Sequence, residues 1–247
     1  MLLFAEISYK GKNYHGWQKQ PNATSVQSVI EKAFNVILRD REFSCIGCGR
    51  TDTGVHAEQF YFHFETDEEI NHNKFMYKVN TLLPADIVVH RLLEVPEGSH
   101  TRFDAISRTY KYYINQKKDA FLTDVSYYNS RKLDVNAMNK ACKCLFDYKD
   151  FTSFSKVNTE TKTNNCVIQY AQWKNNGDSI VFEITADRFL RNMVRAIVGT
   201  MLEVGLGKIT VDQFKKVIET KDRGEAGTSV PGHGLFLTKV SYPYIKD

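Results

Sequence analysis

The sequence has no long hydrophobic run and no strong excess of either charge. Its 247 residues carry 33 Lys and Arg against 29 Asp and Glu, a formal net charge of +4. This balance permits a polyanionic partner but is far from a histone-like polycation. A membrane-spanning helix needs about 20 consecutive apolar residues, and the best candidate stretch, residues 192–205, contains Arg195 and Glu203. The opening apolar residues are interrupted by Glu6 and leave no room for a signal peptide. We therefore expect a cytoplasmic protein without a membrane anchor.

Cysteine is also scarce. The chain has five cysteines, an odd number, which argues against the disulfide framework of a secreted domain. Cys45 and Cys48 have a spacing seen in metal sites, but residues i and i+3 of a strand point to opposite faces. Cys142 and Cys144 would lie about 200° apart on a helix, so neither pair converges on one metal ion. We expect buried structural cysteines and no metal site.

Hydrophobic periodicity predicts the elements of the first half. Residues 2–9 alternate as a strand does, and residues 26–38 repeat apolar side chains at helical spacing, with Thr24 and Gln27 placed as a capping box. Residues 57–65 have a period of two. That strand would direct one set of side chains to one face and another set to the opposite face: Phe60, Phe62 and Phe64 against Gln59, Tyr61, His63 and Glu65.

The remaining elements predict an α+β fold in two halves. Strands are expected over 86–95, 107–116, 165–173, 179–186 and 233–243, and helices over 71–83, over 134–146, from Phe189 and from Val211. Regular β-α-β-α alternation is missing, which favours antiparallel strands with helices packed on one side. The expected halves are residues 1–106 and 107–247. Their similar element order suggests a duplication, without a convincing residue-level repeat.

The stretch CGRTDTGVHA, residues 48–57, presents one carboxylate in a glycine-rich frame. Glycines allow the chain to turn sharply and present Asp52 from a rigid loop. Arg50, if it lies near, would favour the ionised carboxylate that nucleophilic or general-base chemistry requires. An ordinary turn aspartate is the competing interpretation. Asp-Thr-Gly is also the triplet of aspartic proteases, but those enzymes need two such carboxylates, and the sequence holds no second triplet.

Basic and aromatic residues occur together in three further stretches. Arg188, Arg191 and Arg195 would share one arc of the expected helix from Phe189, where they repel one another unless an anion or an acid is near; a solvated helix face is the alternative. The other two stretches are the loop with Lys10, Lys12, Lys19, Tyr14, His15 and Trp17, and the strand face with Arg108, Tyr110 and Tyr112. Cationic side chains beside flat rings suit phosphates and unstacked RNA bases, although tyrosines are also common in strands.

Seven blocks of the sequence, in order, resemble the TruA-type tRNA pseudouridine synthases over essentially the whole chain. They are YHGWQKQP, SVQ, CGRTDTGVHA, RFDAISRTYKYYI, DFTSF, RFLRNMVRAIVGTMLEVG, and GLFL with SYP. The resemblance implies isomerisation of uridine to pseudouridine at positions 38, 39 and 40 in the anticodon stem-loop of tRNA, without cofactor or metal. It also implies a homodimer in which one tRNA contacts both subunits. The implied fold has antiparallel sheets of two halves forming one extended sheet, a central basic cleft, and helices on the outer side.

The resemblance also assigns roles to individual residues. The catalytic aspartate falls on Asp52, the arginine that fills the space of the flipped base on Arg50, the active-site tyrosine on Tyr110, and the arginine that pairs with the catalytic carboxylate on Arg195. Arg188, Arg191, Lys10 and Lys12 are the candidates for contacts to the RNA backbone. Two alternatives stay open, namely a synthase of this family acting on another tRNA site or RNA, and a non-catalytic RNA-binding protein.

Overall fold

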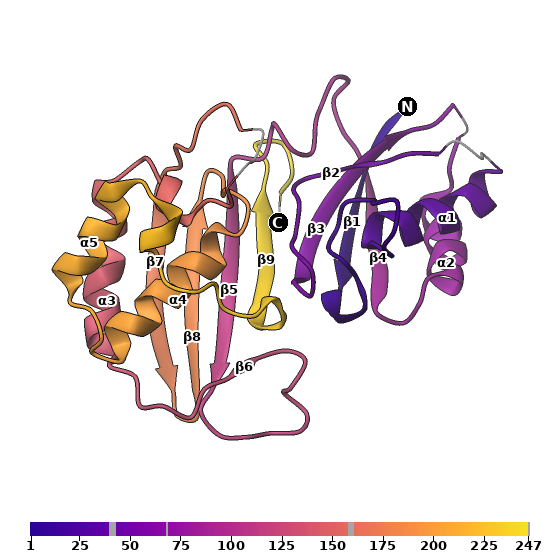
Figure 1. Cartoon of the computed structure of the whole chain (residues 1–247). Coiled ribbons are helices and arrows are strands. Elements are labelled where there is room, and N and C mark those ends of the chain that lie inside the picture. The colour runs from indigo at the N-terminus through magenta and orange to yellow at the C-terminus, as the bar shows by residue number, and fades with distance from the viewer. Residues whose placement is uncertain (40–42, 68, 158–160, 247) are drawn as a thin grey trace. The chain divides into compact units, whose positions relative to one another are not determined.

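The chain, described by a computed structural model over residues 1–39, 43–67, 69–157 and 161–246, divides into two compact units (Figure 1). Unit 1 comprises Met1–Ile106 and Leu237–Asp247, and unit 2 comprises Ser107–Phe236. The described residues form a mixed α/β fold with mostly antiparallel strands and five α-helices. The expected halves placed everything after residue 106 together, whereas the residues from Leu237 onward lie with unit 1.

Unit 1 is built on antiparallel strands. β1 (Leu2–Tyr9) lies between β3 (His56–Glu65) and β4 (Ile87–Glu94) and pairs with both. The short β2 (Ile46–Gly47) pairs with β3. The unit 1 part of β9 (Leu235–Ser241) also lies beside β3. The bounds of β1, β3, β4 and β9 agree closely with the expected strands, whereas the short β2 was not expected.

Two helices, α1 (Val26–Leu38) and α2 (His72–Leu82), supply the core of unit 1. The ring of Phe34 on α1 has its centroid 5.5 Å from that of Phe62 and 5.3 Å from that of Phe64, both on β3, and 5.2 Å from that of Phe75 on α2. The phenylalanine face of β3 is therefore the core face, as its alternation predicted. Burial of such rings contributes about 1.5–3 kcal/mol each.

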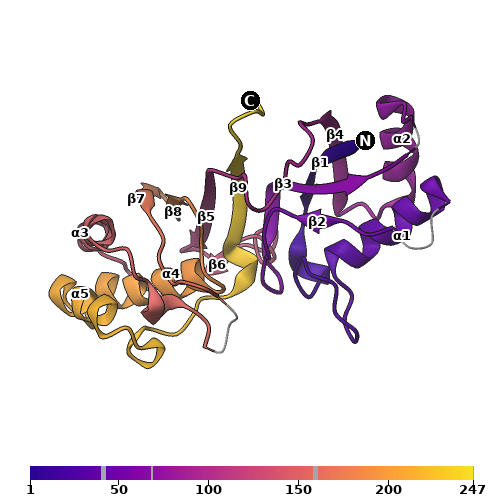
Figure 2. The ribbon, with the colours of Figure 1, turned by 90° about the horizontal axis from the view of Figure 1, so that it is seen from above.

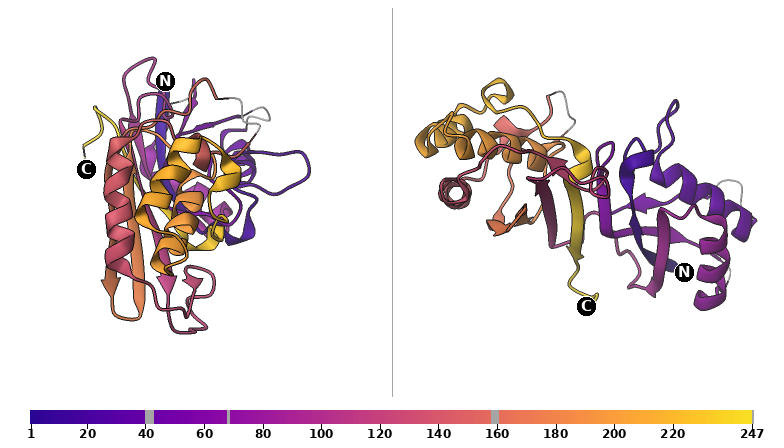
Figure 3. Two further views of the ribbon diagram at one scale, coloured as in Figure 1. Left: turned by 60° about the vertical axis from the view of Figure 1, so that its left-hand side comes forward. Right: turned by 90° about the horizontal axis from the view of Figure 1, so that it is seen from below.

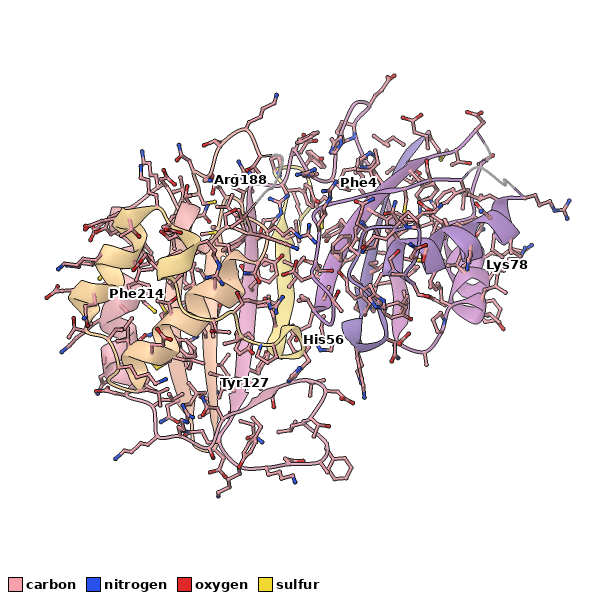
Figure 4. The ribbon with its side chains drawn as sticks, in the orientation of Figure 1. Phe4, His56, Lys78, Tyr127, Arg188 and Phe214 are labelled. Atoms are coloured by element: carbon pink, nitrogen blue, oxygen red, sulfur yellow. The ribbon has the colours of Figure 1, made fainter. Side chains whose placement is uncertain are left out.

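The opposite face of β3 is covered too, which its polar residues did not predict. Tyr61 and His63 are 1% and 8% exposed. The ring of Tyr242, in the returning C-terminal segment, packs edge-on against Tyr61 at 5.2 Å, and Phe4 stacks on His63 at 5.8 Å (Figure 4 labels Phe4). The Tyr242 hydroxyl donates to the Thr101 carbonyl at 2.6 Å. These contacts explain why the end of the chain belongs to unit 1.

The start of α1 differs by one residue from the expected capping box. Ser25 is the N-cap, its hydroxyl accepts from the Ser28 N–H at 3.2 Å, and the Ser28 hydroxyl accepts from the Ser25 N–H at 3.1 Å. The box predicted on Thr24 and Gln27 is therefore wrong. Ser28 satisfies the cap in place of Gln27, whose side chain is used elsewhere.

Unit 2 also combines antiparallel strands with helices. β8 pairs antiparallel with both β5 and β7, and β6 pairs parallel with β5. The bounds of its elements are β5 (Ser107–Asn115), β6 (Tyr127–Tyr128), β7 (Ile168–Asn176), β8 (Ser179–Ala186), α3 (Val135–Cys144), α4 (Met193–Gly205) and α5 (Val211–Thr220). Short 3-10 turns occur at Gly11–Asn13, Leu145–Asp147, Thr152–Phe154, Arg223–Glu225 and Gly232–Gly234.

The three helices of unit 2 gather on one face of its strands (Figures 2 and 3). Trp173 on β7 stacks on Phe182 of β8 at 4.8 Å, and its indole N–H donates to the Met201 sulfur of α4 at 3.2 Å. Cys142 of α3 lies 3.9 Å from the same sulfur. One buried cluster thus joins β7, β8, α3 and α4.

None of the five cysteines forms a disulfide, and all five are buried. Among the described residues, no group of three or more His, Cys, Asp or Glu side chains could hold a metal ion. In the same part of the chain, no helix is long and apolar enough to cross a membrane.

Candidate functional site

Asp52 lies in a tight turn that leads into β3. The Val55 N–H donates to the Asp52 carbonyl at 3.1 Å, and Gly54 has a φ of +77°, a left-handed conformation that favours glycine. The Asp52 side chain is half-buried, whereas its neighbour Thr51 is buried and Thr53 is exposed. The local sequence therefore forms a tight turn that leaves the Asp52 side chain partly exposed, as the glycines predicted.

A second loop, residues 9–17, packs against this turn and supports it through hydrogen bonds. The Gly54 N–H donates to the Tyr14 carbonyl at 3.3 Å, and the Trp17 N–H donates to the Thr51 carbonyl at 3.3 Å. The hydroxyls of Tyr9 and Thr51 lie 2.9 Å apart. The backbone of the Asp52 turn is thus hydrogen-bonded on both sides of the carboxylate.

Two glycines allow these loops to approach so closely. A Cβ at Gly16 would lie 2.3 Å from the Thr51 carbonyl oxygen, and Gly16 also has a φ of +85°. A Cβ at Gly11 would lie 1.9 Å from the Val55 carbonyl oxygen. The Gly11 N–H donates to Nδ1 of His56, which opens β3 (Figure 4), at 3.1 Å. Backbone touches backbone here, so a side chain could be accommodated only by moving the Asp52 turn.

The start of α1 fixes the supporting loop in turn. The N–H groups of Val26 and Gln27 donate to the carbonyls of Gly16 and Trp17 at 3.1 and 3.0 Å, which satisfies donors that a helix start leaves open. The buried Gln27 amide donates to the Cys45 carbonyl at 2.9 Å, and its oxygen accepts from the Lys19 N–H at 2.9 Å. The sequence blocks YHGWQ, SVQ and CGRTDTG therefore form one hydrogen-bonded structure.

Two aromatic residues of the 9–17 loop, Tyr14 and Trp17, support the fold and are not exposed for stacking on RNA, whereas His15 is exposed. Tyr14 and Trp17 are 5% and 1% exposed. Burial and the bond from the Tyr14 hydroxyl to Asp86, at 2.5 Å, raise the pKa of Tyr14 above its ordinary value. Lys19 pairs with the buried Glu31 at 2.9 Å. Of the cations expected to bind RNA in this loop, Lys10 and Lys12 are exposed and flank Gly11.

Arg50 is exposed and lines a pocket of about 230 Å³ within unit 1. The lining residues are Trp17, Gln18, Gln27, Cys45, Ile46, Gly47, Gly49, Arg50 and Arg102. A Cβ at Gly47 would lie 2.4 Å from the Trp17 indole nitrogen, so these two lining residues are in close contact. Two arginines therefore line a small pocket, and one of them, Arg50, comes two residues before Asp52 in the sequence.

In unit 2, Tyr110 lies on β5, opposite Ile184 of β8. Its half-buried ring meets that of Phe189 edge-on, with centroids 5.1 Å apart. Arg108 and Tyr112, on the same face of β5, are 8% and 0% exposed. Arg108 donates to the Asp187 carbonyl at 3.0 Å. The expected basic and aromatic strand face is therefore buried at these two positions, and Tyr110 is the member with part of its ring accessible.

Arg195 is the third residue of α4 and is fixed to the segment 226–232. Its Nε donates to the Val230 carbonyl at 2.7 Å, and the Val230 N–H donates to the Arg195 carbonyl at 3.2 Å. The segment lies against the helix because a Cβ at Gly199 would be 2.0 Å from the Thr228 carbonyl oxygen. Arg195 is thus held to this segment through its Nε and through its backbone.

Arg188 and Arg191 do not share a helical arc with Arg195, so that expectation is wrong. The helix begins at Met193, four residues later than predicted, because Asn192 has a φ of +66°. Arg188 follows the end of β8 (Figure 4), where the Asp187 carboxylate accepts its N–H at 2.7 Å. The Arg191 carbonyl accepts the Lys156 N–H at 3.0 Å. Both arginines lie on the segment that leads into α4.

The predicted site residues come from both units. Asp52, Arg50, Lys10 and Lys12 belong to unit 1, and Tyr110, Arg188, Arg191 and Arg195 belong to unit 2. Within unit 1, the structure brings the turn of Asp52 onto the loop that holds Lys10 and Lys12.

Comparison with known proteins shows the family of this chain. A family model described as tRNA pseudouridine synthase matches residues 141–243. A protein of Parabacteroides distasonis named tRNA pseudouridine synthase A is 56% identical over 97% of this chain and 95% of its own. The proteins of that name from Bacteroides thetaiotaomicron and Bacillus subtilis are 52% and 39% identical, over 97% and 98% of this chain and 90% and 99% of theirs.

The chain belongs to the tRNA pseudouridine synthase A family. The resemblance predicted from seven short blocks is thereby confirmed, and the matches extend well beyond those blocks. Among solved structures, a chain of a Cbf5-Nop10-Gar1 complex aligns over 96% of this chain and 58% of its own, at 12% identity and a TM-score of 0.36. That likeness is too weak to bear on the fold.

In this member of the tRNA pseudouridine synthase A family, several residues that support the candidate site were not predicted from the sequence. Gln27 was expected only to cap a helix, and Gly16 was only part of the block YHGWQKQP, yet both support the loop beneath the Asp52 turn. Arg102 was quoted within RFDAISRTYKYYI without a role, and it lines the pocket beside Arg50. A glycine inside a block of aromatic and basic residues was the available signal, because such a glycine often marks close backbone approach.

Proposed function

We propose that this protein isomerises uridine to pseudouridine in the anticodon stem-loop of tRNA, at positions 38, 39 and 40. The observation that carries the proposal is identity of up to 56% over nearly the whole chain to proteins named tRNA pseudouridine synthase A. The reaction breaks the N1–C1′ bond, turns the uracil, joins C5 to C1′, moves a proton to N1 and removes one from C5. No atom is gained or lost overall.

Asp52 is the proposed catalytic carboxylate. Isomerisation needs an ionised acid at a fixed place near the sugar or ring, since misplacement by about 1 Å can cost about 100-fold in rate. The hydrogen bonds that the Asp52 turn makes with residues 9–17, and the close approach at Gly16, support this role.

Tyr110 and Arg195 are the proposed partners of Asp52 from unit 2. Tyr110 would stack on the uracil and assist removal of the C5 proton, although an unperturbed tyrosine with a pKa near 10 is a weak base at neutral pH. Its edge-on contact with Phe189 sets the plane of the ring. Arg195, fixed at Nε by Val230, would stabilise the ionised Asp52.

The other arginines and lysines serve substrate binding in this proposal. The target base leaves its stack at a cost of a few kcal/mol, and Arg50 would fill the space it leaves. Exposed Lys10 and Lys12, with Arg188 and Arg191, would contact phosphates, which makes tRNA affinity fall steeply with salt. The proposed assembly is a homodimer in the cytoplasm, in which one tRNA contacts both subunits.

The test is release of tritium from tRNA labelled at C5 of uridine. The wild-type protein should release it, while Asp52→Asn should bind the same tRNA and release none. Arg195→Met should lower turnover by far more than it lowers affinity, whereas equal losses would indicate a phosphate contact. Full turnover by Asp52→Asn would refute the catalytic assignment of Asp52. A wild-type protein that binds the tRNA but releases no tritium would favour a non-catalytic RNA-binding role. Mapping pseudouridine in the tRNAs of cells with and without the protein checks positions 38 to 40.

A further inference from the structure

The turn at residues 100–104, within unit 1, carries an exposed aromatic ring on a rigid support. Phe103 is 74% exposed. Its ring lies over the imidazole of His100, with centroids 4.2 Å apart and an interplanar angle of 35°. One side of the phenyl ring is therefore covered by another flat ring, and most of the remainder faces solvent.

Hydrogen bonds hold this turn firmly. The His100 N–H donates to the Asp104 carboxylate at 2.7 Å, and Nδ1 of His100 accepts the N–H of Arg102 at 3.1 Å. The Thr101 hydroxyl donates to the Ile46 carbonyl of β2 at 2.9 Å. The Tyr244 hydroxyl donates to Asp104 at 2.8 Å. A turn tied to β2 and to the C-terminal segment keeps the Phe103 ring in place without burying it.

Arg102 connects this ring to the pocket beside the Asp52 turn. Its guanidinium carbon lies over the Phe103 ring, 5.8 Å from the ring centroid, and Arg102 lines the pocket together with Arg50. The pocket, at about 230 Å³, has room for part of a nucleotide, and its guanidinium groups suit a phosphate or sugar oxygen. Because Arg102 and Phe103 are adjacent in sequence, one nucleotide can contact the ring with its base and the pocket with its phosphate or sugar.

We propose that Phe103 and Arg102 form a binding site for one unpaired nucleotide of the substrate RNA, next to the target uridine. The base stacks on the exposed part of the Phe103 ring, and its phosphate is bound by Arg102 at the pocket that this arginine lines. This inference rests on the proposed function, since it assumes an RNA substrate. It adds to that function a stacking position outside the pocket of the flipped base.

The chemistry of the turn favours a nucleotide over a protein partner. A protein interface buries a central apolar cluster, whereas Phe103 is accompanied by an arginine, an imidazole and a carboxylate. Aromatic rings beside cationic groups are the usual means of binding unpaired RNA bases. Contact with a second protein chain is the alternative that the experiment must separate.

The experiment measures affinity for an unmodified tRNA transcript, and its salt dependence, for the whole protein and its variants. Phe103→Ala should bind about 10- to 100-fold more weakly, the range expected for one lost base stack. Phe103→Trp should restore affinity, and Phe103→Leu should not. The matched control is Phe121→Ala, at a ring that is 93% exposed in unit 2. Arg102→Gln should lower the slope of log affinity against log salt by about one, whereas Phe103→Ala should leave it unchanged.

Several outcomes separate the possibilities. Wild-type affinity in Phe103→Ala, alongside normal pseudouridine formation by the wild type, would overturn this inference and leave the proposed function standing. Light scattering reports the oligomeric state of Phe103→Ala. If this variant changes its oligomeric state but keeps its affinity for tRNA, the ring belongs to a protein interface, and the proposed nucleotide site is overturned as well. A wild-type protein that neither binds nor modifies tRNA would refute both.

Discussion

Replacing Gly16 by alanine should lower the rate of catalysis, although Gly16 is not itself a catalytic residue. A Cβ there would meet the Thr51 carbonyl oxygen at 2.3 Å and the carbonyl carbon of Asp52 at 3.2 Å, so the Asp52 turn must move. The left-handed φ of +85° adds roughly 1 kcal/mol, and overpacking against rigid backbone adds about 1–3 kcal/mol. We expect the free energy of unfolding to fall by about 2–4 kcal/mol. Displacement of the carboxylate should lower turnover by about 100-fold.

Gly98 provides a matched control for this substitution. It has a similar φ of +79°, and nothing lies within 4 Å of the position a Cβ would occupy. Gly98→Ala should therefore cost only about 1 kcal/mol and leave tritium release unchanged. Urea unfolding and single-turnover tritium release measure the two quantities. Equal effects of Gly16→Ala and Gly98→Ala would refute the reasoning, because backbone strain alone would then explain the loss and the contact with Thr51 would carry none of it.

Three further predictions test other parts of the structure. Burial lowers the pKa of His63 to about 4. Because the unfolded chain binds a proton at this histidine below pH 6.5 and the folded chain does not, the free energy of unfolding should fall by up to about 3 kcal/mol as the pH drops from 6.5 to 4. Urea unfolding of His63→Gln across that range should not show this decrease. The Cβ of Gly199→Ala would lie 2.0 Å from the Thr228 carbonyl oxygen, so this variant should lower both the free energy of unfolding and turnover. The Cβ of Gly205→Ala would lie 2.5 Å from the flexible end of a methionine side chain, so this control should lose less in both assays. Equal losses in the two variants would contradict the role of the 226–232 segment. Gln27→Leu should lower the free energy of unfolding by about 2–4 kcal/mol, because it leaves buried partners without hydrogen bonds, and a stability equal to the wild type's would show that the loops hold without it.

Local patterns were sufficient for most elements. The period-two run of β3 and the helical repeat of α1 each require only that one face be apolar, which a short window of sequence records. The glycines around Asp52 likewise predict a turn, because few other residues adopt its backbone conformation. Motif blocks predicted the family, since its members share those residues in the same order.

Contacts between distant segments were beyond such patterns. Tyr61 and His63 read as the polar face of a strand, yet residues near the C-terminus cover them. Arg188 and Arg191 fit a helical arc, yet the left-handed backbone of Asn192 delays the helix. Trp17 read as an RNA-stacking ring, yet it lies buried against Gly47 and Phe60.

The sequence by itself determined the family, the elements of each unit and the identity of Asp52 as the acid to test, because periodicity and motif order are local properties. The tertiary structure alone decided what holds Asp52, namely the backbone of residues 9–17 at Gly16, and what surrounds Arg50, namely a pocket shared with Arg102. These are contacts between segments that are far apart along the chain. Their free energy depends on close packing and on paired backbone groups, which only the folded chain brings within reach.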